Sequence, residues 1–144
     1  MKILILGGTK FVGLHLVNSA LARGHNVTLF NRGKTNPGLF PQAETIIGDR
    51  EHDIPKLAGR TWDAVIDVAG YVPRIVRLSA VGLERSVSQY VYISSISAYA
   101  SLSRVGVNES DSLVTMADET VEDITGETYG PLKVLCEKVV QEVY

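Results

Sequence analysis

The sequence has a single cysteine, Cys136, and no long hydrophobic run. One cysteine excludes a disulfide within the chain and fits a reducing compartment. The apolar stretch 3–6 is too short for a secretory leader and ends in glycines, and nothing approaches the ~20 apolar residues of a membrane span. We therefore expect a cytoplasmic protein that does not enter a membrane, with Cys136 packed in the core.

The chain also lacks an excess of charge of either sign. Lysine and arginine number 14 against 16 aspartates and glutamates, and the formal net charge is −2. This balance gives no electrostatic footprint for nucleic acid or for an anionic membrane. We therefore do not expect nucleic acid to bind this part of the protein.

Metal-ligand patterns are absent as well. The histidines, His15, His25 and His52, are scattered along the chain without metal-ligand spacing. Acidic residues gather in the segment 109–127, which we interpret as a solvated, mobile loop near a substrate opening. A divalent-cation site in this loop is the alternative. We predict no metal.

Short apolar runs alternate with amphipathic segments along the chain, which predicts β-α-β units and a parallel sheet. We predict an α/β fold with a doubly wound sheet of order 3-2-1-4-5 between two helical layers, cut short before its last strands. The expected strands are Lys2–Leu6, Asn26–Phe30, Glu44–Ile47, Ala64–Val68 and Tyr90–Ser94, and the expected helices are Phe11–Arg23, Ile54–Ala58, Pro73–Ser86 and Thr128–Val143.

A glycine-rich turn follows the first strand. Gly7, Gly8 and Gly13 connect the apolar run 3–6 to an amphipathic segment. Glycines at this place let a pyrophosphate approach the backbone N–H groups at a helix N-terminus. Lys10 stands where the spacing G-x-x-G-x-x-G has its middle glycine. The turn predicts dinucleotide binding, and a plain strand-to-helix connection is the alternative.

The residues after the second strand bear on which dinucleotide binds. An acidic residue about 20 positions past the glycines usually binds the adenosine ribose hydroxyls and repels a 2′-phosphate. Here Asn31 is neutral and Arg32 is cationic, so the local charge favours NADP over NAD. A solvated loop arginine is the alternative interpretation of Arg32.

Two further strand ends carry candidate cofactor contacts. Asp49, in Gly48-Asp49-Arg50, follows the third strand and offers a carboxylate to an adenine amino group. Small residues in Val68-Ala69-Gly70, after the fourth strand, let a ribose lie against the backbone. Ordinary turn chemistry and a tight exit from the sheet are the alternatives.

Tyr129 and Lys133 are the most specific candidate catalytic residues. Four positions apart, they share one face of the last expected helix. A nearby ammonium lowers the pKa of a phenol toward the range of a general acid/base. Ser95 would hold a substrate oxygen beside Tyr129, with Ser94 and Ser97 as alternative candidates. A chance surface pair is the other interpretation.

Taken in order, these motifs resemble the extended short-chain dehydrogenase/reductase superfamily and, more narrowly, its NAD-dependent epimerases and dehydratases of nucleotide sugars. The turn, in its form GGTxFxG, is similar to that of an atypical subgroup, which is also similar to chloroplast stem-loop RNA-binding proteins. Family members run to about twice this length, so the chain resembles their N-terminal part. The resemblance covers essentially all 144 residues, and the motifs that carry it are LGGTKFVG at 6–13, GDR at 48–50, DVAG at 67–70, YISSISAY at 92–99 and YGPLK at 129–133.

The resemblance implies a Rossmann-type NAD(P)-binding domain over residues 1–144, with the family's C-terminal substrate-binding lobe absent from this chain. It implies an NAD(P)-dependent oxidoreductase, epimerase or dehydratase acting on a nucleotide-sugar-like substrate, with this part alone inactive and a homodimer as a further expectation. A non-catalytic nucleotide-sensing or RNA-binding module on the same scaffold is the alternative.

By the same resemblance, the catalytic residues are Ser95, Tyr129 and Lys133. The cofactor-binding residues are Gly7, Gly8, Thr9, Lys10, Phe11, Val12, Gly13, Asn31, Arg32, Asp49, Arg50, Val68, Ala69, Gly70, Ser94, Tyr129 and Lys133.

Overall fold

The computed structural model describes residues 1–144 and contains one sheet of five parallel strands. The order of the strands is β3-β2-β1-β4-β5, so the predicted α/β class and the order 3-2-1-4-5 are confirmed. The strands are β1 (Lys2–Leu6), β2 (Asn26–Asn31), β3 (Glu44–Ile47), β4 (Ala64–Asp67) and β5 (Tyr90–Tyr92).

β1 lies in the centre of the sheet and pairs with β2 on one side (Ile3 opposite Val27) and β4 on the other (Ile3 opposite Ala64). The chain first builds outward through β2 and β3, then crosses over to β4 and β5. In an open parallel sheet, the carboxyl ends of the two strands where this reversal occurs form the usual ligand crevice. Here that place lies between the ends of β1 and β4.

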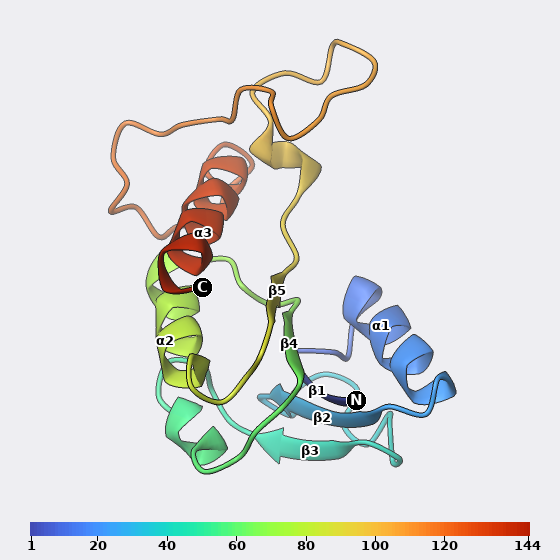
Figure 1. Cartoon of the computed structure of the whole chain (residues 1–144). Coiled ribbons are helices and arrows are strands. Elements are labelled where there is room, and N and C mark those ends of the chain that lie inside the picture. The colour runs from blue at the N-terminus through green and yellow to red at the C-terminus, as the bar shows by residue number, and fades with distance from the viewer.

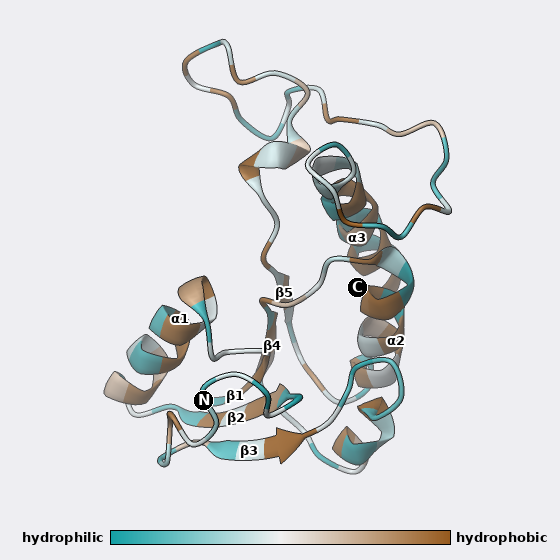
Figure 2. Cartoon of the chain, turned by 180° about the vertical axis from the view of Figure 1, so that it is seen from behind, coloured by the Kyte–Doolittle hydropathy of each residue, from teal (hydrophilic) through white to brown (hydrophobic).

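Helices cover both faces of the sheet (Figure 1). α1 (Phe11–Ala22) lies on one face, while α2 (Pro73–Leu83), α3 (Tyr129–Val143) and the short 3-10 helix η1 (Ile54–Leu57) lie on the other. Figure 2 shows hydrophobic residues along β2 and β4, in the layer between these helices. The side chains of β1 alternate between two cores, with Ile3 and Ile5 in the core under α1 and Leu4 and Leu6 in the core under α2.

α2 and α3 also pack against each other through Val76, Cys136 and Val139. Cys136 is fully buried, which confirms its expected place in the core. Leu132 and Val139 are buried on the same side of α3, while Leu135 is half-buried.

Several element bounds differ from the predicted ones. β4 ends at Asp67, one residue early, because the Asp67 carboxylate accepts a bond from the Ala69 N–H and turns the chain. β5 ends at Tyr92 instead of Ser94, and the 3-10 helix η2 (Ile96–Ala98) follows with Ser95 as its N-terminal cap. α2 ends at Leu83, where the Ser86 N–H closes a turn onto the Leu83 carbonyl.

The segment 99–128, which includes the expected loop 109–127, contains no helix or strand and lies at the end of the molecule where α3 begins (Figure 1). None of the helices combines the length and the apolar character needed to span a bilayer.

Candidate functional site

The turn after β1 is built by Gly7 and Gly8, which both have left-handed backbone conformations, with φ of 105° and 97°. Residues with a Cβ rarely adopt these angles. A Cβ on Gly7 would lie 3.0 Å from Val68 Cγ2, and a Cβ on Gly13 would lie 2.9 Å from the Gly8 Cα. The turn, the start of α1 and the residues after β4 are therefore so close together that a Cβ at Gly7 or Gly13 has no room.

The backbone N–H groups of this turn are free. Those of residues 8–13 donate no hydrogen bond within the chain, and Lys10, the residue before α1, provides no side-chain cap. Free N–H groups and the positive end of a helix dipole together attract a phosphate. Lys10 is exposed, and Phe11 has a left-handed φ of 41° with 85% of its side chain exposed. Backbone strain of this kind is typical of binding sites.

Two asparagines tie the loop after β2 to the turn. The Asn31 amide nitrogen donates to the Gly7 carbonyl at 3.2 Å, and its oxygen accepts from the Gly33 N–H at 2.9 Å. The Asn36 amide donates to the Thr9 carbonyl at 3.0 Å. The Asn31 side chain thus shapes the site from within the protein. No motif marks Asn36 in the sequence.

A pocket of about 260 Å³ lies between this loop and β3. Polar but uncharged residues, among them Thr9, Asn31 and Asn36, form part of its lining. Arg32 and Lys34 alternate in sequence with lining residues, are exposed, and form no ion pair. Two free cations therefore stand at the rim of this pocket.

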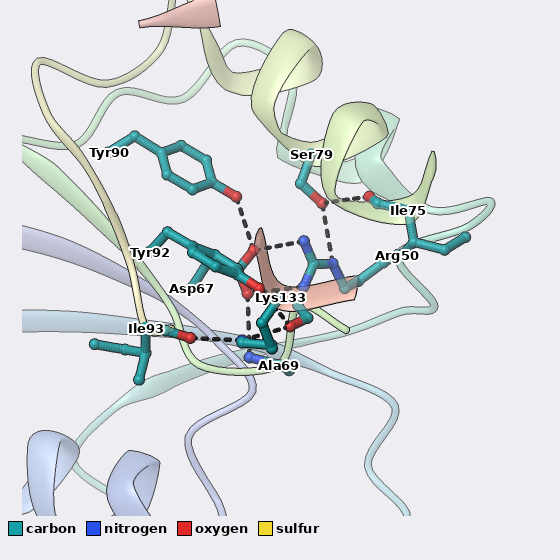
Figure 3. A network of polar contacts seen from close by, with 10 residues as sticks. Arg50, Asp67, Ala69, Ile75, Ser79, Tyr90, Tyr92, Ile93 and Lys133 are labelled. Carbon is teal, nitrogen blue, oxygen red and sulfur yellow. Dashed lines mark hydrogen bonds and ion pairs between the residues drawn. The ribbon is translucent and has the colours of Figure 1, made fainter. Parts of the chain in front are cut away.

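Asp49 lies after the end of β3 with one carboxylate oxygen free. Its other oxygen accepts from the Glu51 N–H at 3.0 Å, and its own N–H donates to Asp53 at 2.8 Å. Arg50, by contrast, is engaged inside the protein (Figure 3). Its guanidinium pairs with both carboxylate oxygens of Asp67, at 2.8 and 2.7 Å, and donates to Ser79 Oγ at 3.0 Å. Only the backbone of Arg50 is left for a cofactor contact.

Asp67 is fully buried at the end of β4 and lies at the centre of the network of polar contacts in Figure 3. Besides Arg50, it accepts from the Tyr90 hydroxyl at 2.9 Å and from the Ala69 N–H at 3.1 Å. The last bond fixes the backbone of the segment 68–70, which packs against the glycine turn.

Lys133 lies beneath this segment with 3% of its surface exposed. Its ammonium donates to the Gly70 carbonyl at 2.9 Å and to the Ile93 carbonyl at 2.6 Å, so it bridges the exits of β4 and β5. Burial lowers the pKa of Lys133, and interactions with Cys136, Asp67 and Glu137 oppose that shift in part.

Tyr129 is the first residue of α3 and is half-buried. It lies one helical turn from Lys133, and the ring of Tyr71 lies 6.3 Å from the Tyr129 ring between centroids. Burial raises the pKa of Tyr71. Tyr71 follows the segment 68–70 directly and joins the cluster through a contact that no motif predicts.

The serines after β5 have separate partners. Ser95 Oγ accepts from the Ser97 N–H at 3.1 Å and so begins η2. Ser94 donates to Glu137 on α3. A Cβ on Gly130 would lie 2.2 Å from the Ser97 carbonyl oxygen, so η2 and the first turn of α3 touch backbone to backbone. Ser95 and Tyr129 therefore lie on two segments that touch each other. The Ser97 side chain is exposed.

The acidic segment 109–127 forms mainly surface contacts. Asp111 pairs with Arg104, and Glu122 pairs with Arg74 at 2.8 Å. No group of three or more histidine, cysteine, aspartate or glutamate side chains is placed to hold a metal ion.

No family model matches the chain. Among curated proteins, the chloroplast stem-loop binding protein of 41 kDa b from Arabidopsis thaliana is 37% identical over 114 residues, which cover 68% of this chain and 30% of that protein.

Solved structures extend the likeness to the whole chain. UDP-glucose 4-epimerase from Bifidobacterium longum, in complex with NAD+ and UDP, superposes with a TM-score of 0.78 at 17% identity, over 99% of this chain and 49% of the epimerase. The NAD-dependent NDP-hexosamine 5,6-dehydratase TunA gives a TM-score of 0.73 at 21% identity, over 99% of this chain and 50% of the dehydratase.

The chain has the Rossmann fold of the nucleotide-sugar epimerases. The predicted resemblance to NAD-dependent epimerases and dehydratases is thereby confirmed at the level of the fold. The chain spans about half the length of these structures and 30% of the curated relative. Membership of the atypical subgroup stays a prediction.

Proposed function

We propose that residues 1–144 form the cofactor-binding part of an NAD(P)-dependent epimerase, dehydratase or reductase that acts on a nucleotide-sugar-like substrate. The observation that carries this proposal is the run of free N–H groups over residues 8–13, placed where the strand order reverses. These groups favour an anion as partner, and the pyrophosphate of a dinucleotide supplies two phosphates at that place. The substrate class is supported by structural neighbours that hold NAD together with UDP-glucose or UDP.

In this proposal the remaining site residues divide by the part of the cofactor they would hold. The turn from Gly7 to Gly13 takes the pyrophosphate, and the free oxygen of Asp49 takes the adenine amino group. The segment 68–70 and Ser94 flank the ribose and nicotinamide. The substrate-recognising part of the protein would lie outside residues 1–144, in line with the greater length of the structural neighbours.

The proposed chemistry is oxidation or reduction at a substrate carbinol. A bound nicotinamide supplies the hydride acceptor or donor. Tyr129, as phenolate, takes the proton of the substrate hydroxyl while the hydride leaves the same carbon, and it returns the proton in the reverse direction. Lys133 keeps a positive charge near the phenolate, and Ser95 orients the substrate oxygen.

We further propose that NADP binds more tightly than NAD. Asn31 offers no negative charge to repel a 2′-phosphate, and its amide is already bonded to Gly7 and Gly33. Arg32 and Lys34 are exposed without ion pairs at the rim of the adjacent pocket. A phosphate there would gain charge-assisted hydrogen bonds that the NAD ribose cannot make.

Calorimetric titration with NADP and with NAD tests the proposal. We expect both to bind, NADP more tightly, and Arg32→Ala to weaken NADP binding about tenfold with little effect on NAD. Gly13→Ala should abolish both, because its Cβ would meet the Gly8 backbone. Arg60→Ala, remote from the site and paired with Glu44, is the matched control. Binding of neither cofactor by the folded chain would refute the assignment.

The proposed catalytic roles are tested in a protein that also contains the substrate-recognising region. The first measurement is the rate of cofactor reduction at saturating UDP-glucose. Tyr129→Phe should lose that turnover and keep cofactor binding. Unchanged turnover would reject the proton-transfer role.

A second candidate function, binding of RNA without turnover on the same scaffold, is favoured by one observation. The curated relative with 37% identity bears a name that describes binding to a stem-loop. The first function requires the chain to bind NAD or NADP, and the second requires it to bind RNA.

A further inference from the structure

The ammonium of Lys133 lies among groups that hold it by more than hydrogen bonds. The ring centroid of Tyr92 is 4.1 Å from Lys133 Nζ, and that of Tyr71 is 5.4 Å away. Both distances are within the range of a cation–π contact, which gains strength where water is excluded. Lys133 is 3% exposed, so the Tyr92 contact is made in a nearly dry environment.

Tyr92 also acts through its hydroxyl. This group donates to the Gly70 carbonyl at 2.9 Å, the same oxygen that receives the Lys133 ammonium at 2.9 Å. One side chain therefore contacts the cation with its face and fixes one of the two carbonyl acceptors with its tip. The other acceptor, Ile93, follows Tyr92 directly in the chain.

We propose that Tyr92 is a positioning residue for Lys133, with its ring keeping the buried ammonium charged and its hydroxyl fixing the Gly70 carbonyl that holds it. Tyr71, more distant and 43% exposed, contributes the weaker second ring. The proposal rests on the proposed function in one respect: that function gives Lys133 its role beside Tyr129.

Other titratable side chains near Lys133 also affect its pKa. Cys136 and Glu137 come from α3, Asp67 comes from β4, and Arg50 comes from the loop after β3. Tyr129 lies one turn before Lys133 on the same helix. Asp67 and Arg50 form a neutral pair, and the Cys136 thiol is buried with a raised pKa, which keeps it uncharged near neutral pH. Glu137 is left as the anion on the same helix, bonded to Ser94.

The sign of the expected effect follows from this arrangement. A ring face attracts the ammonium and not the neutral amine, so the ring raises the pKa of Lys133 against the lowering caused by burial. Removing the ring leaves burial unopposed. Tyr92→Leu should therefore lower the pKa of Lys133 by about one unit.

The measurement is the pKa of Lys133, from the pH dependence of its 13Cε resonance in protein with labelled lysine and no cofactor. The resonance is assigned by its loss in Lys133→Arg. Tyr92→Phe, which keeps the ring, should shift the pKa by less than half as much as Tyr92→Leu. Tyr71→Leu should give a smaller drop than Tyr92→Leu, and Tyr99→Leu, away from Lys133, should give none.

Equal shifts in Tyr92→Phe and Tyr92→Leu, or no shift in either, would overturn the proposal. If Tyr92→Leu does not fold, pentafluorophenylalanine at position 92 keeps the ring shape and reverses its quadrupole, and the same drop is expected. Titration of the labelled protein with NADP is a separate arm. Absence of cofactor binding there would count against the proposed function and leave the Tyr92 result standing.

Discussion

At Asp67, one buried carboxylate holds three groups from separate parts of the chain: the Arg50 guanidinium, the Tyr90 hydroxyl and the Ala69 N–H. Asp67→Asn keeps the size of the side chain but leaves the Arg50 charge buried without a counter-ion. Breaking a buried pair in this way typically costs about 3–5 kcal/mol. We expect a loss of that order in the free energy of unfolding, measured by urea denaturation.

Asp123→Asn is the control for this prediction, because Asp123 is exposed and its carboxylate forms no ion pair. It should change stability by less than about 0.5 kcal/mol. Equal stability of the two variants would show that the Arg50 charge finds water or another partner when Asp67 is neutral.

Single residues were predictable where type and spacing alone carry the chemistry. The left-handed glycines of the turn and the helix that carries Tyr129 and Lys133 have the predicted local geometry, because spacing along the chain fixes it. The chemical roles of these residues stay predictions. Arg50 shows the limit. Its neighbour Asp49 suggested a cofactor contact, but the guanidinium pairs with a carboxylate 17 positions away, and only the fold brings these two together.

At the scale of elements, the start of α3 depends on a close backbone approach. A Cβ on Gly130 would lie 2.2 Å from the Ser97 carbonyl oxygen of η2, so Gly130→Ala must push the two segments apart. We expect a loss of about 1–3 kcal/mol in the free energy of unfolding. Cofactor affinity should fall too, because Tyr129 and Lys133 move with the helix.

Gly126→Ala is the matched control, since a Cβ at that position meets nothing within 4 Å. Urea denaturation and calorimetric titration with NADP measure the two effects. If Gly130→Ala behaved like Gly126→Ala in both, the close contact between α3 and η2 would be dispensable.

Two strands end earlier than predicted, near side chains that bind backbone N–H groups. β4 ends at Asp67, whose carboxylate accepts from the Ala69 N–H, and β5 ends at Tyr92, shortly before the Ser95 hydroxyl accepts from the Ser97 N–H. Apolar patterning continues through Val68 and Ile93 and gives no sign of these stops. Side-chain hydrogen bonds of this kind compete with strand pairing.

For the whole molecule, the strand order followed from general rules. Apolar strands alternating with helices require crossover connections, and those connections favour a doubly wound sheet. Patterning could not show how the loop after β2 closes on the glycine turn, since Asn36 and Thr9 are 27 positions apart and carry no shared signal. The fold was therefore more predictable than the walls of its site.

Charge is also a property of the whole molecule, and it separates the two candidate functions. The net charge is −2, and six of the fourteen lysines and arginines are occupied in ion pairs within the chain. Binding to an RNA backbone gains its free energy from counterion release at several free cations. We expect a dissociation constant weaker than about 10⁻⁴ M for an RNA stem-loop at physiological salt.

Fluorescence anisotropy of a labelled stem-loop over a salt series measures this affinity. The slope of the logarithm of the binding constant against the logarithm of salt concentration should correspond to no more than about two phosphate contacts. The eight lysines and arginines outside ion pairs are scattered along the chain, and only Arg32 and Lys34 come within two positions of each other. NADP titration of the same preparation confirms that the protein is folded. Tight binding with a steep salt dependence, lost when Arg32→Glu and Lys34→Glu are combined, would instead favour RNA binding on this scaffold.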